Sequence, residues 1–382
     1  MKYKIPFNKP FIIGKEIDYI NQSVLNGHIS GDGFFTKKCH ALLEKKLKAS
    51  KILLTTSCTA ALEMAAILCE ICPGDEVILP SFTFVSTVNA FYTRGAKPVF
   101  VDIHPNTLNI DETKIEKAIT EKTKIIVPVH YAGIGCNMDA ITKIANQYNL
   151  FVVEDAAQGV NAKYKDKYLG TIGDLGAYSF HETKNFICGE AGAIVINNEK
   201  FIERAEIIRE KGTNRSKFFR GEIDKYTWVD IGSSYLPSDI LAAFLYAQLE
   251  KMDKITNARQ KIFEYYYQSL TTLVEKGYLT VPTIPQECKN NYHLFYIILE
   301  NEKKRDALMS YLKNNGILSV FHYIPLHLSP VGEKIGYKKG QLPITESISK
   351  RLLRLPFYYD LKKEEQKEVV EKIYNFFGLS SK

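Results

Sequence analysis

The segments LFVVEDAAQG at residues 150–159 and GDLGAYSFHETKNFICGEAGAIV at residues 173–195 hold the pattern that decides the fold. In the first, four apolar residues lead directly to Glu154 and Asp155, as in a buried strand that ends at a polar edge. In the second, a short polar loop that carries Lys184 separates two apolar strands. Both segments therefore predict buried strands that deliver ionisable side chains to their ends.

Short apolar runs of the same kind recur from about residue 50 to residue 200, and they alternate with stretches of helical periodicity. This alternation predicts an α/β lobe with a largely parallel sheet. Ligands bind such sheets at the carboxyl ends of the strands, so the residues that follow each strand matter most. The other predicted strands are KILLTTS (51–57), DEVILPS (75–81), KPVFVDI (97–103), KIIVPVHY (124–131) and GAIVINN (192–198), and the predicted helices are TAALEMAAILCEI (59–71), TKIEKAITE (113–121) and MDAITKIANQYN (138–149).

The C-terminal part of the chain predicts a second, smaller α+β lobe. A polar and aromatic segment, 212–238, is too long for a simple connection and predicts a functional loop. A long helix at 239–270 is expected to lead into the smaller lobe, so we divide the chain into a large domain, 1–245, and a small domain, 246–382. In the small domain we expect strands at HLFYIIL (293–299) and SVFHYIPL (319–326), and helices near 303–315 and 345–378.

The composition is that of an ordinary globular protein, with 45% hydrophobic and 24% charged residues among 382. The net charge of +7 is scattered, so we expect no nucleic-acid partner, although a mild positive bias suits an anionic small substrate. The N-terminus has no signal-peptide pattern, and no window approaches the length of a membrane span. We therefore expect a cytoplasmic protein with no membrane partner.

The seven cysteines are widely spaced and odd in number, which does not fit a disulfide framework. Cys69 and Cys72 form a CxxC pair, but the pair ends an apolar helical run. No second pair and no suitably placed histidine completes a zinc set, so we expect core packing and no metal site.

The residues at the strand ends suggest a cofactor site. Ser57 and Thr59 precede a strongly helix-forming run, where hydroxyls and backbone N–H groups suit a phosphate, although a helix cap without a ligand fits equally. Asp155 ends a buried strand and needs a partner, which a pyridinium nitrogen or a local turn would supply. Lys184 taken alone resembles a surface lysine. Together with Ser179, however, these residues supply donors for a phosphate, a partner for a pyridinium nitrogen and an imine-forming amine.

Several motifs occur in one order along the chain: SCTAAL (57–62), PSFTFVSTVNA (80–90), VEDAAQ (153–158), SFHETKN (179–185) and GSSYLPSD (232–239). In this combination the sequence resembles the DegT/DnrJ/EryC1/StrS family of sugar aminotransferases. Within the family it most resembles the TDP-4-oxo-6-deoxyglucose transaminases that make TDP-4-amino-4,6-dideoxygalactose for surface polysaccharides. The resemblance runs from IPFNKP (5–10) to LLRLPFYYDL (352–361).

The resemblance implies a fold-type-I aminotransferase that uses pyridoxal 5′-phosphate (PLP) and forms a homodimer with shared active sites. It implies that Lys184 carries the cofactor as a Schiff base and that Asp155 pairs with the pyridine nitrogen. An aromatic face fixes the ring plane, and an amide can hydrogen-bond the phenolic oxygen. The other implied contacts are Ser57, Cys58, Thr59 and Ser179 at the phosphate, Phe84 on the ring face, Gln158 beside the phenolic oxygen, and Ser234 reaching the partner's cofactor.

Two positions depart from the wider family pattern. Cys58 stands where glycine is usual, and it offers a backbone N–H without glycine's conformational freedom. Ser234 stands in a segment that commonly carries an asparagine, so it would have to contact the phosphate instead. On the substrate side, the resemblance places His181, Tyr323 and His327 near the sugar, although core packing of Tyr323 is an equal alternative.

The implied reaction transfers an amino group from L-glutamate to a nucleotide-linked keto-sugar in two half-reactions. Lys184 would act as a neutral base with a lowered pKa. The SFH motif at 179–181 favours C-4 over C-3, and the overall resemblance favours the galacto over the gluco product. Sugar dehydratases of the family have histidine in place of this lysine, so transamination is favoured. A non-catalytic PLP-binding regulator is the alternative from another class.

Overall fold

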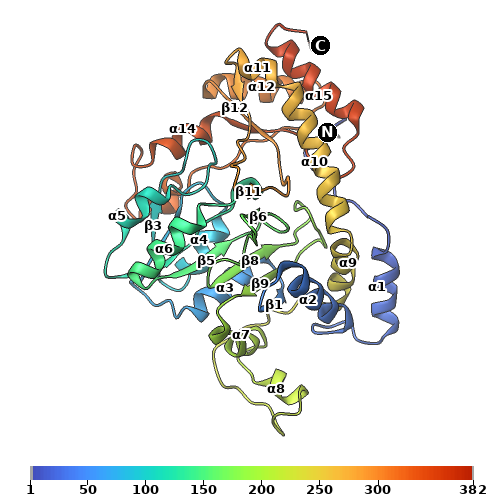
Figure 1. The fold of residues 1–382 in the computed structure, drawn as a ribbon, viewed down its shortest axis with the longest axis vertical. Helices are drawn as coiled ribbons and strands as arrows, with labels where there is room; N and C mark the ends of the chain where they lie inside the picture. The colour runs from blue at the N-terminus through green and yellow to red at the C-terminus, as the bar shows by residue number, and fades with distance from the viewer. Residues whose placement is uncertain (1–2, 381–382) are drawn as a thin grey trace.

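A computed structural model describes residues 3–380, and its largest element is a seven-stranded sheet (Figure 1). The prediction of an α/β fold with a mostly parallel sheet is confirmed, because only one strand, β9, runs against its neighbours. The strand order is β1-β9-β8-β5-β4-β2-β3. The strands are β1 (Lys51–Thr55), β2 (Glu76–Pro80), β3 (Lys97–Val101), β4 (Thr123–Ile126), β5 (Phe151–Asp155), β8 (Leu175–Ser179) and β9 (Gly192–Ile196).

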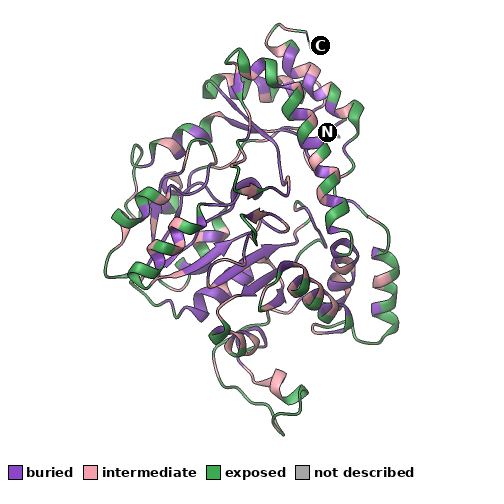
Figure 2. Ribbon diagram, viewed as in Figure 1, coloured by how far each residue is buried: buried purple, intermediate pink, exposed green. Residues whose placement is uncertain are grey.

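Helices cover both faces of this sheet, so its strands are buried (purple in Figure 2) and need apolar residues on both sides. In β1, Leu53 packs with the helices of one face, whereas Ile52 and Leu54 pack with those of the other. The same alternation recurs in β9, where Ile194 and Val195 point to opposite faces. One face carries α3 (Cys58–Leu68), α4 (Val85–Tyr92) and α7 (Ile202–Arg209); the other carries α2 (Phe34–Leu47), α6 (Met138–Tyr148) and α9 (Asp239–Leu249).

The smaller lobe is built on a three-stranded sheet in the order β10-β12-β13. Phe295 and Leu353 pack on one side of this sheet against its helices, whereas Tyr296 and Leu352 face the large lobe. The N-terminal residue Ile5 also belongs to this lobe's core. The elements are β10 (Leu279–Thr280), β12 (Tyr296–Leu299), β13 (Leu352–Arg354), α10 (Met252–Ser269), α12 (Glu302–Asn314), α14 (Pro343–Arg351) and α15 (Lys363–Phe376).

Three expectations for the C-terminal part were wrong. The helix expected at 239–270 is two helices, α9 and α10, because α9 packs against α1 and α2 while α10 packs against α15. The segment 319–326 is not a strand: its one bridge joins Val320 to Arg354, and Pro325 has no N–H to extend a ladder. The helix expected at 345–378 is divided into α14 and α15, with β13 between them. The domain boundary after residue 245 stays a prediction.

The segment that we expected to be a functional loop, 212–238, projects with α8 from the body of the molecule (Figure 1). No helix among residues 3–380 is long and apolar enough to cross a membrane. The remaining elements are α1 (Glu16–Leu25), α5 (Ile115–Ala118), α8 (Arg215–Phe219), α11 (Thr271–Glu275), α13 (Pro330–Lys334), the small sheet of β6 (Lys163–Tyr164), β7 (Lys167–Tyr168) and β11 (Cys288–Lys289), and the 3-10 turns Glu112–Lys114, Tyr131–Gly133, Glu199–Phe201 and Leu326–Leu328.

Candidate active site

A cavity of about 470 Å³ lies where the ends of β5 and β8 and the start of α3 meet the smaller lobe. Its size is within the range of small-molecule sites. It brings together ten of the twelve residues predicted from the sequence, namely Ser57, Cys58, Thr59, Phe84, Asp155, Gln158, Ser179, His181, Lys184 and Tyr323.

The start of α3 forms one wall of the cavity. The Ser57 hydroxyl caps the helix by accepting a hydrogen bond from the Ala60 N–H at 3.0 Å, and the Thr59 hydroxyl donates to Ser86 Oγ at 2.8 Å. Cys58 is the first helical residue and does not have positive φ, so this position does not require glycine. Glycine is required instead at Gly192, where a Cβ would lie 2.4 Å from the Cys58 nitrogen.

The Asp155 carboxylate lies at the end of β5 and is only 6% exposed. Its Oδ2 accepts a hydrogen bond from the Thr87 hydroxyl at 2.6 Å, and its Oδ1 accepts one from the Ala157 N–H at 3.1 Å. Both donors are neutral, and a buried carboxylate is best stabilised by a positive partner. The site is thus suited to a cationic group of a ligand.

Gln158 connects the two lobes across the cavity. Its Oε1 accepts a hydrogen bond from the Ala132 N–H at 2.7 Å, and its Nε2 donates to the Tyr323 hydroxyl at 3.2 Å. The hydrogen bond from Ala132 also fixes the orientation of the amide, because an N–H must meet the oxygen. Tyr323 therefore lines the cavity with its hydroxyl toward the large lobe.

Lys184 lies in the turn between β8 and β9, where its backbone N–H donates to the His181 carbonyl at 2.9 Å. Burial lowers the pKa of the Lys184 amine; the neighbouring Cys58 and Asp155 oppose this shift, and the Arg354 charge adds to it. A lowered pKa increases the neutral fraction of the amine, the form that acts as nucleophile and base.

Two histidines that the sequence motifs did not single out also line the cavity, His293 buried and His322 half-buried. His293 Nδ1 lies 2.9 Å from Asn185 Oδ1, and His322 Nδ1 lies 3.0 Å from the Tyr131 hydroxyl. Burial holds the pKa of both imidazoles well below the usual value, and the nearby Lys184 contributes. Both are therefore neutral at physiological pH. They lie in the segments expected as strands, where nothing in the local sequence separates a cavity residue from a core residue.

Two of the predicted residues do not line the cavity. His327 is fully buried, with Nδ1 2.7 Å from Ser81 Oγ and Nε2 3.1 Å from Glu346 Oε1, so both ring nitrogens are engaged away from the site. The structure thus places it differently from our expectation. Ser234 is exposed and forms a bridge to Glu210 at the base of the projecting segment. Its expected contact with a partner subunit stays a prediction.

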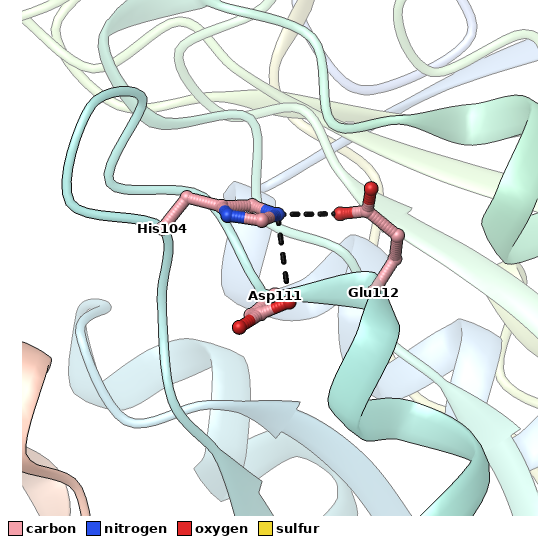
Figure 3. A group of neighbouring side chains, drawn as sticks. All are labelled: His104, Asp111 and Glu112. Atoms are coloured by element: carbon pink, nitrogen blue, oxygen red, sulfur yellow. Dashed lines mark hydrogen bonds and ion pairs between the residues drawn. The ribbon is translucent and has the colours of Figure 1, made fainter.

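One group of side chains outside the cavity has the composition of a metal site (Figure 3). His104 Nε2 lies 2.7 Å from Glu112 Oε2 and 3.6 Å from Asp111 Oδ1. The Lys114 ammonium lies 3.0 Å from Asp111 and already supplies a positive charge there. We therefore interpret the group as an ion-pair cluster.

Comparison with known proteins gives a consistent result. The model of the DegT/DnrJ/EryC1/StrS aminotransferase family matches residues 10–374. The chain belongs to this family. It is 38% identical to the pleiotropic regulatory protein of Geobacillus stearothermophilus, covering 90% of both chains. It is 32% identical to the GDP-perosamine synthase of Escherichia coli O157:H7, covering 99% of this chain and 100% of that protein. Among solved structures, the PLP form of Spr1654 from Streptococcus pneumoniae superposes with a TM-score of 0.90 at 27% identity, covering 98% of both chains.

Members of the DegT/DnrJ/EryC1/StrS family are PLP-dependent sugar aminotransferases, which confirms the predicted enzyme class, fold and cofactor. The residues present fit the cofactor. The open N-terminus of α3 with its hydroxyls suits a phosphate, and the buried Asp155 has only neutral partners and suits a protonated ring nitrogen. The lowered pKa of Lys184 suits an amine that forms an imine.

Proposed function

We propose that the enzyme transfers the amino group of L-glutamate to dTDP-4-dehydro-6-deoxy-D-glucose. The products are dTDP-4-amino-4,6-dideoxy-D-galactose, for surface polysaccharide biosynthesis, and 2-oxoglutarate. The observation that carries transamination is the meeting of Lys184, Asp155 and the start of α3 in one cavity. A histidine at position 184 would instead have favoured a dehydratase.

In this proposal Lys184 Nζ moves the protons of both half-reactions. It takes the proton from Cα of L-glutamate, and it later delivers a proton to C-4 of the sugar. Its lowered pKa favours the neutral amine that the first transfer requires. The bound cofactor supplies an electron sink, and Asp155 would maintain it by keeping the ring nitrogen protonated.

The other cofactor contacts remain part of the proposal. Ser57, Cys58, Thr59 and Ser179 would hold the phosphate through hydroxyl and backbone donors. Phe84 would pack on the ring, and its 58% exposure is consistent with a side chain that a ligand covers. Gln158 would lie beside the phenolic oxygen, with its Nε2 as the donor.

The sugar contacts and the position of amination rest on the motif resemblance. His181 and Tyr323 both line the cavity and are proposed to contact the hexose. The SFH motif supports C-4, and a relative named GDP-perosamine synthase supports a nucleotide-linked sugar as substrate. The galacto product requires that Lys184 protonate one particular face of C-4, and the pose of the hexose sets which face it meets.

Nuclear magnetic resonance of the enzymatic product tests both points. We expect nitrogen on C-4 and small couplings between the C-4 proton and both of its ring neighbours, as an axial amine requires. Large couplings to both neighbours would identify the gluco epimer, and nitrogen on C-3 would refute the assigned position.

A second candidate is a non-catalytic regulator, because one relative is named a pleiotropic regulatory protein. Absorbance of the purified, PLP-loaded protein separates the two. An aminotransferase loses its yellow colour when L-glutamate is added, whereas a regulator without turnover keeps it. The lowered pKa of Lys184 supports the enzyme.

We also propose a homodimer with shared active sites. The projecting segment exposes four large aromatic side chains, and such patches usually mark an interface. Their exposed fractions are 38% for Phe218, 69% for Phe219, 50% for Tyr226 and 77% for Trp228. Sedimentation should show a dimer, and a fully active monomer would refute the proposal. Mixing Lys184→Ala and Ser234→Trp subunits should restore activity if Ser234 completes the partner's site.

A further inference from the structure

Arg354 is a cavity residue that the proposed reaction has not used so far. It ends β13 and lies opposite Tyr296 of β12. On its other side, its N–H donates to the Val320 carbonyl at 2.8 Å, and its carbonyl accepts from the Val320 N–H at 3.2 Å. Because two backbone hydrogen bonds join it to Val320 and its strand pairs with β12 on the other side, the side chain projects from a rigid position.

The guanidinium of Arg354 has no anionic partner among residues 3–380. Its Nε is buried without a hydrogen-bond partner, and the groups that influence its charge are the hydroxyls of Tyr131 and Tyr323. On another side it packs on Phe7, with Cζ 4.6 Å from the ring centroid. A half-buried cation whose Nε is cut off from water is costly unless a ligand supplies the anion.

Neither acidic residue that lines the cavity forms an ion pair with Arg354. Asp155 accepts hydrogen bonds from Thr87 and Ala157, and Glu190 Oε1 lies 3.4 Å from His181 Nε2. Arg354 and Lys184 both add to the lowering of the His293 and His322 pKa values, and these neutral imidazoles provide no negative charge. The Arg354 guanidinium is thus desolvated, and the anion that neutralises it must come from a bound ligand.

We propose that Arg354 binds the α-carboxylate of the amino-acid donor, an inference that rests on the proposed function. In an α-amino acid the carboxylate and the reacting amine share one carbon, so the carboxylate must bind close to Lys184. Arg354 meets this condition, because it lines the same cavity and its charge reaches the lysine amine. A guanidinium also offers two parallel N–H donors, which match a carboxylate in bidentate geometry.

The diphosphate of the nucleotide sugar is the other anion that Arg354 could meet. The hexose ring, however, separates the diphosphate on C-1 from the reacting C-4. A group beside Lys184 is therefore placed for the donor carboxylate and not for the diphosphate.

The two half-reactions, each followed by the absorbance of the PLP-loaded enzyme, distinguish binding of the donor carboxylate from binding of the sugar diphosphate. For L-glutamate alone, Arg354→Gln should lower the second-order rate constant by about 30- to 1,000-fold, the loss expected when one partner of a buried charge pair is truncated. Arg354→Lys keeps the positive charge but loses the two parallel N–H donors, so its rate constant should lie between those of Arg354→Gln and the wild type. The reverse half-reaction with the amino-sugar should change much less.

Arg351→Gln is the matched control, because Arg351 lies outside the cavity and its Nε donates to the Ser347 carbonyl. Binding of maleate, an unreactive dicarboxylate, gives a second readout by calorimetry and should weaken in the same order. Equal glutamate rates in Arg354→Gln and wild type, or a rate loss confined to the amino-sugar, would overturn the inference about Arg354 and leave the proposed function standing. A wild-type enzyme that does not respond to L-glutamate would overturn the proposed function, and the inference with it.

Discussion

The support that Thr87 gives to Asp155 leads to a quantitative prediction for Thr87→Val. The substitution preserves the shape of a fully buried side chain but removes its hydroxyl. Asp155 Oδ2 then loses its 2.6 Å hydrogen bond, and the Thr83 hydroxyl loses its 2.8 Å contact. A hydrogen bond to a charged group contributes about 1.5–3 kcal/mol, and an orphaned buried hydroxyl costs about 1–3 kcal/mol. Because such losses are not additive, we expect unfolding free energy to fall by about 2–4 kcal/mol.

Urea unfolding of the cofactor-free protein, followed by circular dichroism, measures this change. Circular dichroism is preferred to fluorescence, because the single tryptophan, Trp228, is 77% exposed. Thr93→Val is the control: Thr93 is exposed just after α4, and its hydroxyl donates to the Asn89 carbonyl at 2.9 Å. The control should change stability by no more than about 0.5 kcal/mol. If the two variants are equally stable, Thr87 does not support the carboxylate and the reasoning is wrong.

Four further predictions concern the cofactor and its lysine. Borohydride reduction of the loaded enzyme, followed by peptide mass mapping, should place the cofactor mass on Lys184, and a mass on another lysine would refute the assignment. The rate of the glutamate half-reaction should rise with pH, because the neutral Lys184 amine is the base. The midpoint of this rise should lie below the ordinary lysine pKa of 10.5, because burial lowers the pKa of Lys184. In Arg354→Gln the midpoint should move to higher pH, because the substitution removes a positive charge that lowers the pKa of Lys184. Gly192→Ala should push the start of α3 away, since its Cβ would lie 2.4 Å from the Cys58 nitrogen. We expect a stability loss of about 1–3 kcal/mol and weaker PLP binding. An unchanged melting curve and unchanged retention of PLP on dialysis would contradict this prediction.

Much of the large lobe followed from the sequence alone. Strands covered by helices on both faces must be apolar at every position, so short runs of valine and isoleucine identify them without knowledge of their neighbours. The relation between Asp155 and Lys184 could also be anticipated. Asp155 ends β5 and Lys184 follows the end of β8, and these two strands are parallel neighbours whose carboxyl ends meet at one edge of the sheet.

The smaller lobe was predicted less well, because its elements depend on contacts that are distant in the sequence. The break between α9 and α10 arises because the two helices pack on different lobes. His327 illustrates the same limit for single residues. Its motif suggested a substrate contact, but Ser81 and Glu346, both remote in sequence, engage its ring.

The tertiary structure alone decided what completes the cavity. His293, His322 and Arg354 come from the smaller lobe, whereas Lys184 and Asp155 come from the large one. A local pattern shows whether a residue is on a strand or helix, but not which residues the folded chain brings opposite to it. The burial that lowers the pKa of Lys184, and the absence of an anion beside Arg354 among residues 3–380, exist only once the two lobes close around the same space.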